Sequence, residues 1–189
     1  MNKLILIAGI PASGKTRYGL HISNRLNLIF FSKDAFKEKL HDVLKWDNAV
    51  RENSKFYGMA AYSVFFHAVE CAMRTGAPLA IESNFVPECE ETLNVFASRY
   101  CYEALTVLFD ADSKILHRRF IERDLTGERH RGLISGGLKH DDFSPENFEK
   151  SCAPMRDFII GERIVVDTTD FAKVDYGEID EKVIGFLNR

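Results

Sequence analysis

The sequence predicts an α/β fold built around a parallel β-sheet. Short apolar segments alternate with helical segments along the whole 189-residue chain, which is typical of a sheet covered by helices on both faces. The first apolar run, LILIA at Leu4–Ala8, holds no polar residue, as expected for a central strand with both faces buried. The length suits one domain with a substantial core, so we expect a single domain over residues 1–189.

The remaining elements follow in order. Strands are expected at 4–8, 28–31, 79–81, 105–109 and 164–166. Helices are expected at 15–26, 88–100, 113–124, 145–160 and 176–188. Residues 34–74 carry aromatic and apolar side chains near helical spacing, which predicts a long helical insertion between the second and third strands. Residues 126–143 are polar and glycine-rich without periodicity, and a loop of this length in a compact domain is usually functional.

The composition excludes several classes of protein. A net charge of −3 gives no overall basic field, so we expect no stable binding to duplex nucleic acid. The four cysteines are scattered without a CxxC pair, which indicates reduced thiols and a cytoplasmic protein. The first apolar run is too short to span a bilayer and lacks a signal-peptide cleavage site, so no membrane association is expected. The oligomeric state is left open.

The clearest motif is GIPASGKT at residues 9–16, which matches G-x-x-x-x-G-K-[ST] between a buried strand and a helix. The glycines permit backbone angles that turn successive amides inward around phosphate oxygens. Lys15 can reach the β- and γ-phosphates of ATP, and the Thr16 hydroxyl can ligate Mg²⁺. The residues expected to bind ATP here are Gly9, Pro11, Ala12, Ser13, Gly14, Lys15 and Thr16. A chance glycine turn is the alternative, and the complete pattern in its context disfavours it.

Other P-loop classes fit less well. The later strands are not followed by an N-K-x-D segment, as in regulatory GTPases, and no apolar strand ends in paired acidic residues, as in ATP-driven motors. The chain instead resembles the P-loop kinases that include phage polynucleotide kinase, zeta toxins and chloramphenicol phosphotransferase. The resemblance covers essentially the whole chain, although only the P-loop is a specific motif. It implies a three-layer P-loop fold, a five-stranded parallel sheet of order 2-3-1-4-5, and a mobile lid at about 124–143.

The segment Ser32-Lys33-Asp34 follows the second strand. Ligands of open α/β sheets bind beyond the carboxyl ends of the strands, where a carboxylate can orient and deprotonate an alcohol. In the resembling kinases an acidic residue here accepts the proton of the attacking hydroxyl, which implies that role for Asp34. Alternatively, Asp34 caps a helix that begins at Ala35. Lys37 stands where polynucleotide kinases carry an arginine. We expect it to contact the acceptor, with a polynucleotide acceptor less favoured.

Glu82 begins the segment Glu82-Ser83-Asn84 after the third strand. The implied strand order places this strand beside the first, so Glu82 is expected next to the P-loop. There it can hold a Mg²⁺-bound water or the acceptor hydroxyl. The alternative is an ordinary strand-end turn, in which Ser83 and Asn84 bond to the local backbone.

An arginine cluster includes an L-x-x-R-x-x-x-R pattern, which places Arg119 and Arg123 on one helical face. Similar arginines in the resembling kinases clamp the transferring phosphoryl group when the lid closes. We therefore expect both to contact ATP, with Arg123 catalytic. The alternative, a solvated helix face, fits Arg118 better. For Arg129 and Arg131 the two interpretations are balanced.

Three weaker signals remain open. The run VVDTT at 165–169 is expected either to border the adenine, as the equivalent loop does in the resembling kinases, or to form a local turn. Trp46, Phe56 and Tyr57 are expected either to line an acceptor pocket or to belong to the core. The core is the more common place for aromatic residues of a helical segment. Asp112 is first of all a helix cap.

Taken together, the motifs predict a kinase that uses ATP and Mg²⁺, with Lys15, Asp34 and Arg123 as catalytic residues. The hydroxyl acceptor is a small molecule, a nucleotide or a nucleic-acid end, and the sequence does not choose among them. The alternative is an ATP-binding regulatory switch that acts through a partner, because a fold does not determine function.

Overall fold

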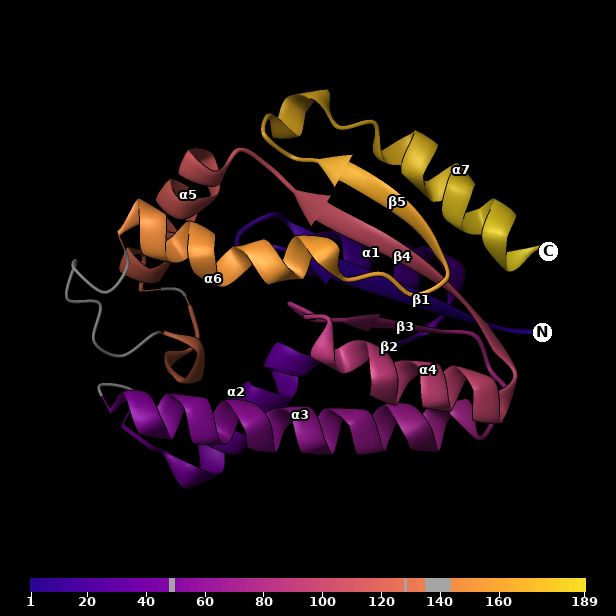
Figure 1. The fold of residues 1–189 in the computed structure, drawn as a ribbon, viewed down its shortest axis with the longest axis horizontal. Coiled ribbons are helices and arrows are strands. Elements are labelled where there is room, and N and C mark those ends of the chain that lie inside the picture. Colours follow the sequence, from indigo (N-terminus) through magenta and orange to yellow (C-terminus); the bar gives the residue numbers. More distant parts are fainter. Residues whose placement is uncertain (48–49, 128, 135–143) are drawn as a thin grey trace.

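The computed structural model describes residues 1–47, 50–127, 129–134 and 144–189 (Figure 1). Its strands are β1 (Asn2–Gly9), β2 (Ile29–Ser32), β3 (Leu79–Glu82), β4 (Tyr102–Asp110) and β5 (Glu162–Asp167). Its α-helices are α1 (Lys15–Leu26), α2 (Lys33–Leu44), α3 (Arg51–Met73), α4 (Glu88–Tyr100), α5 (Ser113–Leu125), α6 (Pro145–Asp157) and α7 (Tyr176–Leu187). Two short 3₁₀ turns complete the described chain: η1 (Arg131–Leu133) and η2 (Phe171–Lys173).

The strands form one parallel sheet in the order β2-β3-β1-β4-β5, so the predicted fold class and strand order are confirmed. The central strand is β1, in which Leu4 pairs with Leu79 of β3 on one side and with Ala104 of β4 on the other. Because all five strands are parallel, their carboxyl ends share one edge of the sheet. Figure 1 shows α5 and α6 together at the end toward which the arrows of β4 and β5 point.

Helices cover both faces of the sheet, which explains the unbroken apolar run in β1. Successive side chains of a strand point to opposite faces. Leu4 and Leu6 pack in the same core cluster as Phe65 of α3 and Leu93 of α4. Ile5 and Ile7 belong to the opposite cluster, whose helical members on α1 and α7 are Tyr18, Ile22, Ile179, Val183 and Phe186.

The predicted helical insertion over 34–74 is confirmed, and it consists of two helices. The first, α2, begins directly after β2 and ends where Lys45 takes the left-handed conformation at φ 48°. The second, α3, begins at Arg51. No glycine or proline marks the break, so the apolar spacing alone could not reveal it.

The helix expected over 145–160 also ends early, at Asp157. Phe158 and Ile160 turn inward instead and are almost fully buried. The Ile160 amide donates a hydrogen bond of 3.0 Å to Thr106 Oγ1 on β4. The free energy gained by burying these two apolar side chains exceeds that of one further turn of helix.

Part of the predicted lid lies outside the described residues, namely residue 128 and residues 135–143. In the described part, α5 extends to Leu125 and η1 packs against α2. A β-carbon on Gly132 would lie 2.6 Å from His41 Cβ, so the two segments are in close contact. His130 Nδ1 accepts from the Gly132 amide at 3.0 Å, and its Nε2 lies 2.9 Å from Asp42 Oδ1. None of the helices in the described part of the chain is long and apolar enough to cross a membrane.

Candidate active site

The loop between β1 and α1 turns sharply at three residues with positive φ: Gly9 at 127°, Ala12 at 66° and Gly14 at 92°. Only glycine fits the first of these positions. A β-carbon there would lie 2.0 Å from the carbonyl oxygen of Phe109 on β4. The turn therefore depends on close packing of the two strand ends and brings the loop back to the start of α1.

Lys15, the first residue of α1, reaches back across this loop. Its Nζ donates a hydrogen bond of 2.7 Å to the carbonyl oxygen of Ile10, and the side chain is buried. Burial lowers the pKa of Lys15 to about 8, although Glu82 and Asp34 act in the opposite direction. Within the loop, Ser13 Oγ is buried, and no hydrogen-bond partner for it exists among the described residues. The loop thus offers polar groups whose bonding capacity is unfilled.

A cavity of about 370 Å³ opens beside this loop, at the edge where the strands end. Its volume lies in the range of small-molecule sites. The predicted site residues that line it are Pro11, Ala12, Gly14, Lys15, Thr16, Asp34, Lys37, Glu82 and Arg123. Gly9 and Ser13 are buried in the loop behind this wall. The side chain of Arg119, also predicted as a site residue, does not line this cavity and points elsewhere.

Asp34 is the second residue of α2, and Ser32 occupies the N-cap position. The alternative that Asp34 caps a helix starting at Ala35 is therefore wrong. Lys33 Nζ donates to Asp34 Oδ1 at 2.6 Å. Burial raises the pKa of the Asp34 carboxyl, but Lys33, Lys15 and Arg129 outweigh burial, so the pKa is lowered overall. Asp34 is consequently an ionised carboxylate that faces the cavity.

Glu82 pairs with Ile7 of β1 in the sheet register, which places it beside the P-loop as predicted. Ser32 Oγ donates a hydrogen bond of 2.6 Å to Glu82 Oε2. Burial raises the pKa of Glu82 in spite of Lys15 and this hydrogen bond. The cavity therefore holds two carboxyl groups whose pKa values are shifted in opposite directions, an arrangement typical of functional sites.

Arg119 and Arg123 share a helix face but diverge at their tips. The Arg119 guanidinium donates to the carbonyl oxygens of Thr168 and Thr169, at 2.8 and 3.0 Å, and lies 4.0 Å from the centre of the Phe171 ring. Arg123 lines the cavity instead. Its Nε is buried, and the described residues supply no hydrogen-bond partner for it. Burial and the neighbouring Arg129 lower the pKa of Arg123.

The other arginines of the cluster separate into two groups. Arg118 is exposed, and its Nε lies 3.9 Å from Glu122 Oε1, so the solvated-face interpretation is confirmed for it. Arg129 lines the cavity and forms an ion pair with Asp124, and both side chains are largely buried. Arg131 at the start of η1 is exposed.

Several residues of the cavity wall were not singled out from the sequence. Lys33 beside Asp34 is one. Others are Asn84 after β3, Phe120 on α5, and the α6 residues Phe148, Ser151, Cys152 and Met155. The apolar spacing of α6 signals a buried face, but it does not say that this face covers the P-loop. Trp46 stacks on Tyr57 with ring centres 4.2 Å apart, and Phe56 is exposed. None of these three aromatic residues lines the cavity.

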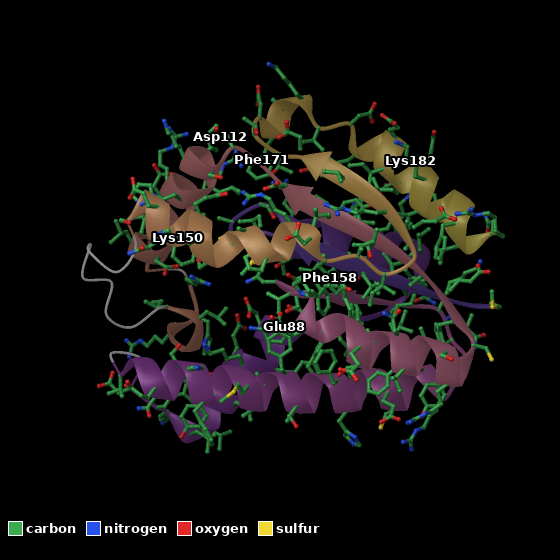
Figure 2. The ribbon with its side chains drawn as sticks, in the orientation of Figure 1. Glu88, Asp112, Lys150, Phe158, Phe171 and Lys182 are labelled. Atoms are coloured by element: carbon green, nitrogen blue, oxygen red, sulfur yellow. The ribbon has the colours of Figure 1, made fainter. Side chains whose placement is uncertain are left out.

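A second pocket, of about 390 Å³, lies on the other side of Gly14. Its walls come from α1, from η2 and from the start of α7, and they include Tyr18, Phe171 and Tyr176. The loop after β5 forms the predicted local turn, because the Thr169 amide donates to Asp167 Oδ1 at 2.8 Å. Figure 2 shows Phe171 near Asp112, at the tips of β5 and β4. The predicted cap is also confirmed, since the Asp112 side chain accepts from two amides of the first turn of α5.

The strand order, the loop geometry and the cavity at the strand ends define the fold of the P-loop kinases. No protein-family profile and no curated protein matches the sequence. Among solved structures, a candidate kinase from Chloroflexus aurantiacus is 27% identical with a TM-score of 0.81, over 99% of this chain and 96% of that one.

Two more distant structures show the same fold. The APS kinase CysC of Mycobacterium tuberculosis, solved with AMPPNP and APS, is 13% identical with a TM-score of 0.60, over 100% of this chain and 98% of that one. The shikimate kinase of Acinetobacter baumannii, solved with shikimate, is 14% identical with a TM-score of 0.56, over 97% and 91% of the two chains. At this level of identity the likeness concerns the fold alone.

Proposed function

We propose that the chain is an ATP- and Mg²⁺-dependent kinase that transfers the γ-phosphoryl group to a hydroxyl of a small molecule or nucleotide. The observation that carries this proposal is the convergence of Lys15, Asp34 and Arg123 on one cavity beside the P-loop. A lysine at the phosphate loop, an ionised carboxylate and a guanidinium that faces the same cavity are the groups that phosphoryl transfer to an alcohol requires.

The P-loop side of the cavity would hold the triphosphate. Lys15 and the positive end of α1 both favour negative charge, and amides of the loop would donate to phosphate oxygens. The pocket beyond Gly14 would take the base against Phe171 and Tyr176, with Arg119 on the other side of the Phe171 ring. These positions support the expected ATP contacts of the loop, and Arg119 would act on the nucleotide through the Phe171 ring.

The residues at the loop also fit Mg²⁺, which prefers oxygen ligands and keeps several of its waters. The Thr16 hydroxyl and the Glu82 carboxylate both line the cavity next to Lys15. Thr16 would be the direct ligand, and Glu82 would hold a metal-bound water or the acceptor hydroxyl. When bound, Mg²⁺ neutralises part of the phosphate charge.

In the proposed reaction, Asp34 accepts the proton of the acceptor hydroxyl as its oxygen forms the bond to the γ-phosphorus. The bond between that phosphorus and the β–γ bridging oxygen breaks, and ADP leaves with the electron pair. Lys33 keeps Asp34 ionised for this step. Arg123 stabilises the charge that spreads over the transferring group.

A small-molecule acceptor is supported by several fold neighbours, which are kinases of shikimate, gluconate and APS. The narrower resemblance to polynucleotide kinases, zeta toxins and chloramphenicol phosphotransferase rests on the sequence motifs and stays part of the proposal.

The test uses ATP labelled at the γ-phosphate, with Mg²⁺ and separate pools of sugars, hydroxy acids, nucleosides and nucleotides. The expected result is label in an organic product from one pool, with no transfer by Lys15→Ala. Label found only in inorganic phosphate from every pool would contradict the kinase and favour the regulatory switch.

A further inference from the structure

The segment 129–134, which follows α5, contacts two parts of the molecule with alternate residues. Arg129 and Leu133 line the cavity beside the P-loop. The side chain of His130 and the backbone of Gly132 face α2 instead. The segment is therefore a wall of the cavity on one side and a layer on α2 on the other.

His130 makes two hydrogen bonds that fix its ring. Its Nδ1 accepts from the Gly132 amide at 3.0 Å, and this bond caps η1. The proton of the neutral ring therefore lies on Nε2, which donates to Asp42 Oδ1 at 2.9 Å. The ring also packs edge-on against His41, with 5.5 Å between ring centres. One side chain thus both shapes η1 and ties it to α2.

The backbone of Gly132 strengthens this attachment. A β-carbon there would lie 2.6 Å from His41 Cβ and 2.9 Å from His41 Cγ, so η1 rests directly on the α2 side chain. By contrast, a β-carbon on Gly127, where the chain leaves α5, would meet no atom within 4 Å. Contacts with α2 therefore hold the segment more closely than contacts at the turn after α5.

Arg129 precedes His130 in the chain, and its side chain enters the cavity. Consecutive Cα atoms are only about 3.8 Å apart, so a ring fixed on α2 also fixes the point from which the Arg129 side chain starts. At its other end, the guanidinium forms an ion pair with the buried Asp124 of α5. Its place in the cavity depends on both anchors.

The charge of Arg129 acts on groups that the proposed reaction uses. Burial lowers the pKa of Arg123, and Arg129 lowers it further. Two guanidinium groups that repel each other in this way both gain free energy when an anion lies beside them. Burial raises the pKa of Asp34, and Arg129 is among the cations that outweigh burial. A shift of Arg129 would therefore change the electrostatics of the reaction.

We propose that His130 is a positioning residue for phosphoryl transfer: through its bond to Asp42 it holds Arg129 where the guanidinium stabilises the charge of the transferring group. This inference rests on the proposed kinase function and adds to it a pair of residues outside the cavity. Neither His130 nor Asp42 lines the cavity beside the P-loop. Loss of their bond therefore acts on the reaction through Arg129.

The hold on segment 129–134 can be measured without an acceptor, by hydrogen–deuterium exchange and mass spectrometry. Asp42→Ala should raise exchange of the segment by about tenfold or more, because the attachment to α2 is lost. Lys39→Met is the control. Lys39 is exposed and lies 2.9 Å from the other carboxylate oxygen of Asp42, so its loss should change exchange by less than about twofold. Equal exchange in Asp42→Ala and the unmodified protein would overturn the proposal.

Transfer is measured with γ-labelled ATP and the acceptor pool that takes up label. His130→Asn removes the bond to Asp42 but keeps a side-chain oxygen that can cap η1. It should lower kcat about tenfold and leave KM for ATP within about twofold, because the misplaced charge matters most in the transition state. His130→Gln keeps an N–H group long enough to reach Asp42 and should restore most of the rate.

A double-mutant cycle distinguishes positioning from a structural role. Arg129→Met should lower kcat at least as much as His130→Asn, and the double variant should be no slower than Arg129→Met alone. Gly132→Ala, which pushes the segment off His41 and leaves the His130–Asp42 pair unchanged, should behave like His130→Asn in the same cycle. Independent, multiplying effects of His130→Asn and Arg129→Met would overturn the proposal.

The outcomes separate the two proposals. Unchanged affinity for AMPPNP with Mg²⁺, measured by calorimetry, shows that each variant is folded. No transfer to any pool by the unmodified protein would overturn the kinase function, and the positioning role with it. Normal kcat in both His130→Asn and Asp42→Ala would overturn the positioning role alone.

Discussion

The Nζ atom of Lys33 lies 2.6 Å from Oδ1 of Asp34, the next residue in the chain. Neighbouring residues of a helix normally point in different directions, and these two meet because α2 begins with them. Lys33 is also held over the ring of Tyr62, with 5.2 Å between Nζ and the ring centre. The carboxylate proposed as proton acceptor thus carries its own counterion, fixed by packing against α3.

Removal of that counterion should change the pH dependence of the reaction. Lys33 lowers the pKa of Asp34, so Lys33→Met should raise it. The reaction needs the ionised carboxylate, and activity falls as the pH falls through this pKa. The acid limb of the pH–rate profile of kcat should therefore move to higher pH in Lys33→Met, and Lys33→Arg should largely restore it. An unshifted acid limb would show that Lys33 does not control the proton acceptor.

Asp34→Asn tests the proton acceptor itself. The amide cannot take a proton from the acceptor hydroxyl, so kcat should fall by about 10²–10⁴-fold. The affinity for ATP, measured by calorimetry, should stay nearly unchanged because Asp34 is not one of the residues proposed to bind ATP. Glu38→Gln on the same helix is the control and should retain full activity. Normal turnover in Asp34→Asn would remove this residue from the mechanism.

Arg123 and Arg118 form a matched pair on one helix. Arg123 lines the cavity with its Nε atom buried, and Arg118 is exposed. Arg123→Met should lower kcat by about 10²–10³-fold, because the charge of the transferring phosphoryl group loses its donor. Arg118→Met should leave kcat within twofold. Steady-state kinetics with ATP and the identified acceptor measures both, and equal effects of the two substitutions would contradict the assignment.

Lys15→Met should abolish ATP binding and at the same time stabilise the folded protein. The pKa of about 8 means that the folded state disfavours the charged amine relative to the unfolded chain. That penalty is fully present below pH 8, disappears as the pH rises toward 10.5, and has an upper value of about 3 kcal/mol. Denaturant unfolding at pH 7 should show the gain in stability, with the exposed Lys182→Met as control. A loss of stability would contradict the burial penalty.

Gly9→Ala should destabilise the fold by about 3 kcal/mol or more, because the new β-carbon would clash with the Phe109 carbonyl and the φ of 127° is strained for alanine. Gly127 also has a positive φ, of 72°, but open space around it. Gly127→Ala should therefore cost only about 1 kcal/mol. Thermal and urea unfolding of both variants give the comparison, and similar costs would show that packing on β4 does not fix the loop.

Much of the fold was predictable because buried strands have a simple signature. The LILIA run identified the central strand, and the P-loop pattern identified the helix that follows it. The place of Glu82 beside the loop followed from the strand order and is confirmed by its pairing with Ile7. The first two depend on local sequence, and the third depends on the strand order that the resemblance to P-loop kinases implies.

The remaining features depend on contacts between distant segments, which periodicity does not encode. Helical spacing correctly placed Arg119 and Arg123 on one face, but the loop after β5 binds one guanidinium and leaves the other in the cavity. Ser32 is the N-cap residue of α2, but its Oγ bonds to Glu82 of the neighbouring strand instead of capping the helix. The α6 wall of the cavity is likewise a product of tertiary packing.

The pairing of β1 constrains when the nucleotide site can form during synthesis. Leu4 pairs with Leu79 and with Ala104, which are 75 and 100 residues further along the chain. Closing such long loops is slow, and chains fold from their N-terminus as they leave the ribosome. The residues of the phosphate loop, 9–16, are synthesised about 100 residues before the Phe109 carbonyl against which Gly9 packs. A nascent chain that stops before β4 therefore has the complete P-loop motif but none of its shape.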